Sequence, residues 1–280
     1  MKSTPVAIVT GASSGIGKAT VRSLIQQGYR VYCGARRVEQ MADLAEDGGK
    51  VHYLDLTDAH SIDAFVAHIL DKETRIDLLV NNAGYGAYGA VEDMPMEEAR
   101  KQFEVNLFGL AAITNAVLPT MRQRRQGRIV HVGSMGGKFW SILGGWYQAT
   151  KFALEGFADC SRNELRPFGI DVVLIQPGAI RTEWSSIAID SIRQTSGQGP
   201  YRPIAEAAAN FFENNKSMEC DPQLVADVIV KAATVKRPKA RYAAPKVASV
   251  ALFCRRFMSD ALLDRLFGRY MGVPHKIDIG

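Results

Sequence analysis

Cysteine is scarce in this sequence of 280 residues, and its four copies are widely spaced. They form no CxxC pair and have no cluster of histidines near them, so neither a zinc site nor a disulfide framework is expected. We therefore expect no bound metal, and we expect thiols that stay reduced, as they do in the cytoplasm. The four residues are Cys33, Cys160, Cys220 and Cys254.

Long apolar runs are also missing. A helix that spans a bilayer needs about 20 mostly apolar residues, and the apolar stretch 247–254 ends at Arg255 and Arg256. The first residues, MKSTPVAIVTG, enter an apolar strand at once, which leaves no room for the charged and apolar regions of a signal peptide. We expect a soluble, cytoplasmic protein.

The net charge of +5 is compatible with an anionic partner. Basic residues gather at 122–128 and at 236–241, but no stacking aromatic side chains lie among them. We interpret both groups as solvated helix ends or loops, with an anionic cofactor or substrate as the alternative, and we expect no nucleic acid.

The spacing of apolar residues predicts an α/β protein. Short β-branched runs alternate with longer stretches in which apolar residues recur at three- and four-residue intervals. This alternation is typical of a doubly wound, mostly parallel sheet covered by helices on both faces, the three-layer αβα Rossmann fold. The predicted strands are 6–10, 30–35, 50–54, 77–80, 128–133 and 171–175, and the predicted helices are 15–27, 38–46, 58–73, 97–125 and 146–168.

Residues 1–280 are predicted to form a single domain. Its core covers about 5–182. Scattered Ser, Gly, Pro and Asn then mark about 183–219, which we interpret as a mobile lid over the substrate. The last region, about 220–280, is predicted to hold a helix at 221–236, a short strand at 241–244 and a basic amphipathic tail at 247–270.

A glycine-rich turn follows the first predicted strand. Residues 10–17 read TGASSGIG, with the spacing GxxxGxG, and they lie between a strand and a helix, the context that makes such a motif informative. Glycine lets the backbone turn sharply and approach a pyrophosphate, which the free N–H groups of the following helix then hold. The motif predicts a nucleotide site formed by Gly11, Ser13, Ser14, Gly15, Ile16 and Gly17.

The end of the second predicted strand bears on the choice between NAD and NADP. An acidic side chain there binds the ribose 2′-OH, whereas arginine complements a 2′-phosphate. The sequence has Arg36 and Arg37 and no acid. We therefore expect NADP(H), with Arg36 on the phosphate and Arg37 near the adenine or in solvent. Asp55, followed by Leu56, is placed to contact the adenine edge, but from the residues alone a cap of the helix that begins near Asp58 explains Asp55 better.

A tyrosine and a lysine, Tyr147 and Lys151, lie four residues apart on one predicted helix face. A free phenol has a pKa of about 10, and a neighbouring positive charge lowers that pKa and makes the tyrosine a usable acid or base. Ser134 follows the fifth predicted strand, so its hydroxyl can point into the same pocket. Asn106 lies on an otherwise apolar helix, where it has either a structural role or holds a water that passes protons from Lys151 to solvent.

Together these elements resemble the short-chain dehydrogenase/reductase family over about residues 5–182. The match is specific because eight elements occur in the family's order. They are TGASSGIG, Asp55-Leu56, Asn81-Asn82-Ala83-Gly84, Asn106, Ser134, YQATK, Pro177-Gly178 and Thr182.

The resemblance implies a catalytic tetrad and a bound dinucleotide. Asn106, Ser134, Tyr147 and Lys151 would carry the proton chemistry while NADPH delivers the hydride to a ketone or aldehyde. Tyr147 and Lys151 would also contact the cofactor, Lys151 at the nicotinamide ribose. Relatives are commonly homodimers or homotetramers, which we expect here too. Further cofactor contacts implied by the resemblance are Asp55, Leu56, Asn82, Ala83, Gly84, Pro177, Gly178, Ile180 and Thr182.

Apolar and aromatic residues around the tetrad favour a hydrophobic substrate, although a core or a subunit interface explains them as well. In lid length, in the two arginines and in the extended tail, the sequence is similar to the steroid, retinol and acyl-dihydroxyacetone-phosphate reductase branch. That branch includes 17-beta-hydroxysteroid dehydrogenases. Two rival functions are a non-catalytic NADPH-binding regulator and a reductase that lies on a lipid surface through its tail, 246–271. For that tail, packing on the domain or on another subunit is favoured over a membrane. The apolar and aromatic residues around the tetrad are Tyr85, Tyr88, Phe139, Trp140, Ile142, Leu143, Trp146 and Trp184.

Overall fold

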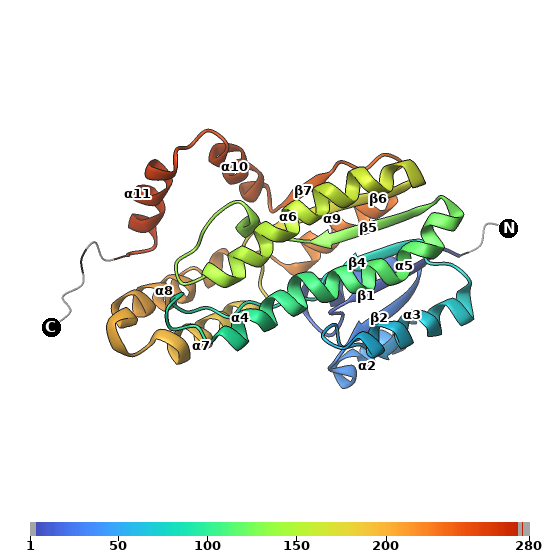
Figure 1. The fold of residues 1–280 in the computed structure, drawn as a ribbon, viewed down its shortest axis with the longest axis horizontal. Helices are drawn as coiled ribbons and strands as arrows, with labels where there is room; N and C mark the ends of the chain where they lie inside the picture. Colours follow the sequence, from blue (N-terminus) through green and yellow to red (C-terminus); the bar gives the residue numbers. More distant parts are fainter. Residues whose placement is uncertain (1–3, 274–275, 277–280) are drawn as a thin grey trace.

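The structure is a computed structural model that describes residues 4–273 and 276. Within these residues, seven parallel strands form one sheet in the order β3-β2-β1-β4-β5-β6-β7 (Figure 1). The order reverses between β1 and β4, so a crevice for ligands is expected at the carboxyl ends of these two strands. The strands are β1 (Val6–Thr10), β2 (Arg30–Ala35), β3 (Lys50–Tyr53), β4 (Leu78–Asn81), β5 (Gly127–Val132), β6 (Ile170–Pro177) and β7 (Arg241–Ala244).

Helices cover both faces of the sheet, and the α/β Rossmann fold predicted from the sequence is confirmed. One face is packed by α1, α2 and α9, and the other by α3, α5 and α6 (Figure 1). The helices are α1 (Gly15–Gln26), α2 (Ala42–Glu46), α3 (Ala59–Glu73), α4 (Met96–Phe103), α5 (Leu110–Arg124), α6 (Gly145–Leu165), α7 (Trp184–Ser196), α8 (Arg202–Asn214), α9 (Pro222–Thr234), α10 (Lys246–Arg255) and α11 (Asp260–Tyr270).

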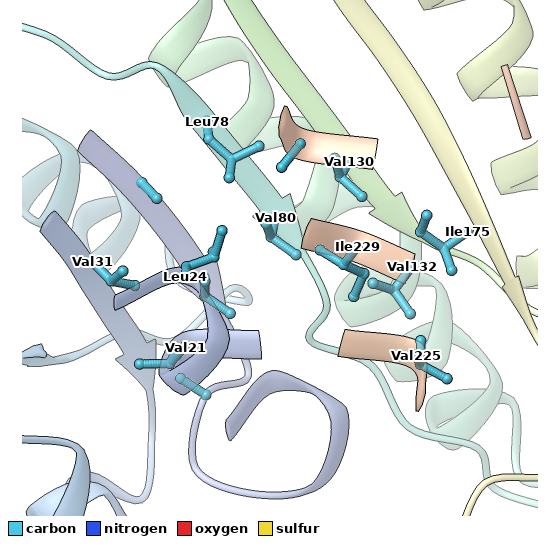
Figure 2. Close-up of a cluster of buried hydrophobic side chains, with 14 of the residues drawn as sticks. Val21, Leu24, Val31, Leu78, Val80, Val130, Val132, Ile175, Val225 and Ile229 are labelled. Carbon is cyan, nitrogen blue, oxygen red and sulfur yellow. The ribbon is translucent and has the colours of Figure 1, made fainter. Parts of the chain in front are cut away.

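The strands are apolar on both sides because both faces are buried. In β1, Ala7 and Val9 join the hydrophobic cluster under α1 and α9, while Val6 and Ile8 join the cluster under α3 and α5. Figure 2 shows the first cluster, in which Val21 and Leu24 of α1 lie near Val31 of β2, and Val225 and Ile229 of α9 lie near Val130 and Val132 of β5. Each such side chain stabilises the fold by about 1.5–3 kcal/mol when fully buried. The strand ends that carry the glycine turn and Ser134 are thereby held in place.

The predicted helix at 97–125 is not one continuous α-helix. A π-helical turn, Glu104–Gly109, separates α4 from α5. Here the chain passes very close to the loop after β3, since a Cβ on Gly109 would lie 2.3 Å from the carbonyl oxygen of Leu56. A π-helical turn adds one residue to a single turn of the helix. This barely changes the apolar spacing over about thirty residues, so the sequence pattern did not reveal the break.

The segment predicted as a lid contains two helices, α7 and α8. Their apolar sides, among them Ala188, Ile192, Ala205 and Ala208, pack in one cluster with Tyr147. The segment therefore packs beside Tyr147. Its mobility stays a prediction.

The basic tail forms two helices, α10 and α11, and α11 packs on the rest of the chain. Leu263 and Met271 are buried, and the ring of Phe267 stacks on Phe139 with centroids 5.5 Å apart. Figure 1 shows α11 beside α8, and Tyr270 contacts Phe211 of α8 at 5.1 Å between ring centroids. The end of the predicted C-terminal region, 274–275 and 277–280, lies outside the described residues. None of the helices in the described part is long and apolar enough to cross a membrane.

Candidate active site

The glycine turn adopts a conformation that only glycine accommodates easily. Gly11 has φ +65° and Gly15 has φ +54°. A Cβ on Gly17 would lie 2.3 Å from the Gly11 carbonyl oxygen, so α1 packs directly on the turn. Ser14 is the N-cap of α1, but its side chain makes no capping hydrogen bond. The first N–H groups of α1 are therefore left for an anion at this end.

The residues after β4 lie against the glycine turn. The Asn82 side chain donates to the carbonyl oxygens of Thr10 (3.0 Å) and Gly11 (3.1 Å), and the N–H of Ala83 donates to Thr10 Oγ1 (3.0 Å). Gly84 follows, and a Cβ there would lie 3.0 Å from Asn106 Oδ1 and 3.7 Å from Lys151 Nζ. The strand-end residues predicted from the sequence thus join the turn to the Tyr147 region.

The two arginines after β2 occupy different positions. Arg36 is exposed, and no described residue forms a hydrogen bond or an ion pair with it. Arg37 is exposed too, but its Nη2 lies 3.5 Å from Ser13 Oγ and 3.4 Å from Ser14 Oγ and forms an ion pair with Glu183 at 3.0 Å. Arg37 therefore lies over the glycine turn, rather than being a free side chain in solvent.

The alternative role considered for Asp55, as the cap of the next helix, is wrong. Asp58 is the N-cap of α3 and accepts a hydrogen bond from the N–H of His60 at 2.9 Å. Asp55 instead accepts from the N–H (2.9 Å) and the hydroxyl (2.8 Å) of Thr57, and these bonds fix the loop that follows β3. Leu56 is buried beside it.

The segment after β6 runs back to the glycine turn. Pro177 ends β6, and the N–H of Gly178 donates to the Ala244 carbonyl oxygen at 2.8 Å. Ile180 is buried and pairs with Cys220 in a parallel bridge. The methyl group of Thr182 reaches the turn, where a Cβ on Gly15 would lie 2.9 Å from it.

Tyr147 and Lys151 lie on one face of α6 and are both buried, with 8% and 7% of their surface exposed. Lys151 Nζ donates to the Val132 carbonyl oxygen at 3.3 Å and lies 5.8 Å from the centroid of the Tyr147 ring. Ser134, directly after β5 and Gly133, accepts a hydrogen bond from the N–H of Gly136 at 2.9 Å. The structure thus brings all three residues to the end of β5.

The pKa of Tyr147 departs from the expectation that Lys151 lowers it. Burial raises that pKa to about 12, and a hydrogen bond from Ser134 opposes the rise only in part. Burial also lowers the pKa of Lys151 to about 8, because the buried ammonium loses its hydration. Desolvation is thus the main influence on both groups, and the phenol holds its proton more tightly than a free tyrosine does.

Asn106 lies in the π-helical turn and is almost fully buried, at 1% exposed. Its amide donates to the Tyr85 carbonyl oxygen (2.8 Å) and to Thr150 Oγ1 (3.1 Å), and its carbonyl accepts from the N–H of Tyr85 (3.0 Å). These bonds tie α6 to the loop after β4, which is the structural alternative considered for this residue. Single-turn π-bulges are frequent at functional sites.

The aromatic side chains fall into separate groups. Tyr88 and Trp184 pack on Tyr147, with ring centroids 5.7 and 5.4 Å away. Phe139 and Trp140 instead contact Phe267 of α11. Ile142 and Leu143 join the cluster around Tyr147, whereas Trp146 and Tyr85 belong to a different cluster, near α4.

Two features of the site were not found from the sequence. Glu183 reaches Arg37 across 146 positions of chain, and no local pattern encodes such a contact. For the tail that forms α11, the sequence favoured packing on the domain or on another subunit, but it did not identify Phe139 as the contact. The apolar spacing of Leu263, Phe267 and Met271, at intervals of four, was the available signal.

Comparisons with known proteins agree with this arrangement. Residues 5–190 match the family model described as short chain dehydrogenase. A 3-ketodihydrosphingosine reductase from Bacteroides thetaiotaomicron is 35% identical over 239 residues, which cover 84% of this chain and 86% of that protein. An NADPH-dependent 3-dehydrocapnine reductase from Ornithobacterium rhinotracheale is 31% identical over 280 aligned residues, 93% of this chain and 95% of that protein. The crystal structure of a short-chain dehydrogenase from Streptomyces avermitilis matches with a TM-score of 0.80 at 32% identity, covering 98% of this chain and 99% of that one.

The fold and the site define a dinucleotide-binding α/β oxidoreductase. The chain belongs to the short-chain dehydrogenase/reductase family, as the sequence motifs implied. This family uses NAD(P)(H) to interconvert carbonyl compounds and alcohols. The residues present fit that cofactor, because the first turn of α1 has unpartnered N–H groups and the glycines keep the adjoining backbone open.

Proposed function

We propose that the protein is an NADP(H)-dependent enzyme that interconverts a hydrophobic ketone or aldehyde and the corresponding alcohol, with Tyr147 as the general acid and base. One observation carries this proposal. A buried phenol with a raised pKa lies next to a buried ammonium at the strand end where the glycine turn, Gly84 and Ser134 converge. A proton held there is available to an alkoxide that forms in the pocket.

The neighbouring residues have separate roles in this proposal. The Ser134 hydroxyl acts on Tyr147 by lowering its pKa, and it orients the substrate oxygen toward that phenol. Lys151 holds the nicotinamide ribose and stabilises the phenolate after the proton has left. Asn106 is a positioning residue that ties α6 to the loop carrying Gly84.

The cofactor is proposed to be NADP(H), which supplies the hydride when it is bound. Arg36 is free among the described residues, and Arg37 lies over Ser13 and Ser14 of the turn, so two guanidinium groups are available for a 2′-phosphate. The two positions directly after β2 are both arginine, so neither offers a carboxylate to a 2′-OH. The relative from Ornithobacterium rhinotracheale is named as NADPH-dependent.

We propose a hydrophobic substrate and a homo-oligomer. Tyr88, Trp184 and Leu143 make the surroundings of Tyr147 apolar, and two relatives are named as reductases of 3-keto and 3-dehydro compounds. Phe108, in the π-helical turn, and Phe152, on α6, are 56% and 49% exposed. Large apolar side chains on such a surface suit a contact with a second copy of the chain.

Replacing Tyr147 by Phe tests the proposed chemistry. The substitution removes the acidic hydroxyl and leaves the ring, so NADPH binding should persist while carbonyl reduction falls about 10²- to 10⁴-fold. NADPH fluorescence and its oxidation in the presence of quinones, steroids, aliphatic aldehydes and 3-oxoacyl thioesters measure the two properties. Tyr242→Phe, which removes a phenol on β7 that accepts from the N–H of Lys239, is the control and should keep full activity.

Turnover that survives Tyr147→Phe would refute the assignment of the acid. NADPH binding by the wild-type protein without reduction of any carbonyl compound would favour a non-catalytic regulator instead.

A further inference from the structure

A cavity of about 590 Å³ opens next to the Tyr147 cluster. Its walls come from the loop 140–145, from Ala90 and Val91, from the start of α8 and from α11. This volume lies within the range of about 300–1,000 Å³ that is usual for small-molecule sites. The cavity combines an apolar floor with the polar face of a helix.

The cavity adjoins the catalytic residues through a shared wall. Ile142 and Leu143 line it and also belong to the hydrophobic cluster of Tyr147. Leu143 has φ +58°, which is unusual for a bulky residue, and its carbonyl oxygen accepts a hydrogen bond from the N–H of Gly89 at 2.8 Å. Ser141 donates to the hydroxyl of Tyr88, whose ring packs on Tyr147. The residues that line the cavity thus contact the side chains packed around Tyr147.

Two arginines of α11, Arg265 and Arg269, line the cavity one helical turn apart, and Asp264 of the same helix is the one acidic residue in the lining. Neither forms an ion pair or a side-chain hydrogen bond with any residue the structure describes, whereas Arg255 of α10 is paired with Asp260. Like charges four residues apart on a helix repel each other. An anion bound between them would remove that repulsion, and guanidinium groups match the oxygens of phosphate and carboxylate.

The opposite side of α11 fixes where these charges lie. Leu263 and Met271 are buried, and Phe267 stacks on Phe139 and contacts Trp140, which itself lines the cavity. The helix is therefore held against the cavity, and its two arginines stand at the rim at a defined place.

We propose that this cavity is a distal substrate subsite, in which Arg265 and Arg269 bind an anionic group and the apolar wall of Trp140, Ile142 and Leu143 holds the chain leading from it to the carbonyl carbon. The inference deepens the proposed function and rests on it for the reaction. The substrate is then an amphiphile with a carbonyl at one position and a phosphate, sulfonate or carboxylate at another.

Binding of decyl phosphate, measured by calorimetry below its micelle concentration, tests the subsite without any turnover. Decyl phosphate should bind at least about tenfold more tightly than decanol or inorganic phosphate, because it offers both the chain and the charge. The double variant Arg265→Gln/Arg269→Gln should lose that advantage. Arg256→Gln, which removes an exposed charge of the same extension outside the cavity lining, should keep it.

Equal binding of decyl phosphate by the wild-type protein and the double variant would overturn the inference. So would weak binding of decyl phosphate together with sedimentation on phosphatidylglycerol vesicles that depends on the same arginines, since this would assign them to a membrane surface.

Turnover separates this inference from the proposed function. A series of ω-oxo carboxylates and their methyl esters should be reduced with NADPH, and the acids should have a kcat/KM about tenfold above the esters in the wild type but not in the double variant. Equal reduction of acids and esters would leave the reductase in place and overturn the anion subsite. Arginine-dependent binding of decyl phosphate without reduction of any carbonyl compound would support the anion subsite and overturn the proposed reductase.

Discussion

Replacing Lys151 by Met should stabilise the cofactor-free protein while removing its activity. Lys151 is 7% exposed, and burial lowers its pKa from 10.5 to about 8. Each unit of pKa corresponds to about 1.4 kcal/mol, so at pH 7 the buried charge costs the folded state about 3 kcal/mol. Met also loses the hydrogen bond to the Val132 carbonyl oxygen, worth about 1 kcal/mol. The net gain in the free energy of unfolding is about 2 kcal/mol.

The lowered pKa of Lys151 determines how the stability gain changes with pH. Buried Lys151 holds its proton less tightly than an unfolded lysine, so between pH 8 and 10.5 the unfolded state binds more protons. The stability contributed by this group in the wild type therefore rises with pH across that window. At pH 9.5 the cost of the buried charge falls to about 1 kcal/mol, which the lost hydrogen bond cancels.

Thermal unfolding at pH 7.0 and at pH 9.5 measures both effects. At pH 7.0 Lys151→Met should unfold about 4–8 °C above the wild type, and at pH 9.5 at nearly the same temperature. Lys101→Met, on the exposed face of α4, should show no such pH-dependent gain. A variant that is less stable at pH 7.0, or one whose gain is equal at both pH values, would refute the reasoning.

Two further predictions concern the cofactor. Arg36→Asp places a negative charge where a 2′-phosphate is proposed to lie, so the ratio of kcat/KM for NADPH to that for NADH should fall about 10- to 100-fold; an unchanged ratio contradicts the assignment. Glu183→Gln frees the half-exposed Arg37 from its ion pair, so NADPH should bind up to about fivefold more tightly in a fluorescence titration at low salt, and the gain should shrink at high salt. Weaker binding by this variant would show that the ion pair supports the site.

Much of the fold follows from local pattern. The strands at 6–10, 30–35 and 241–244 have the bounds predicted for them, because buried parallel strands are short runs of β-branched residues between turn residues. The glycine turn and the Tyr147–Lys151 pair were also visible, since their chemistry depends on spacing within a few residues.

What local pattern missed depends on contacts between distant parts of the chain. The π-helical turn at Asn106 accompanies a close approach between Gly109 and Leu56, and no residue type marks it in advance. The raised pKa of Tyr147 was missed for a similar reason: the sequence shows the charge of Lys151, but only the packed structure shows how little water reaches either group.

The proton-transfer residues come from the chain before Pro177, and much of the cavity wall comes from the chain after it. This division bears on how such a protein can diversify in evolution. The glycine turn, Ser134, Tyr147 and Lys151 all lie before Pro177, on elements anchored in the central sheet. The helices α7 and α8, which pack around Tyr147, and α11, which lines the cavity with the start of α8, come after it and meet the rest mainly through apolar contacts. The later segment can thus be exchanged among homologues, by recombination or in engineered chimaeras, with the proton-transfer groups left where they are. A single ancestral scaffold can in this way give rise to enzymes that differ in what they accept.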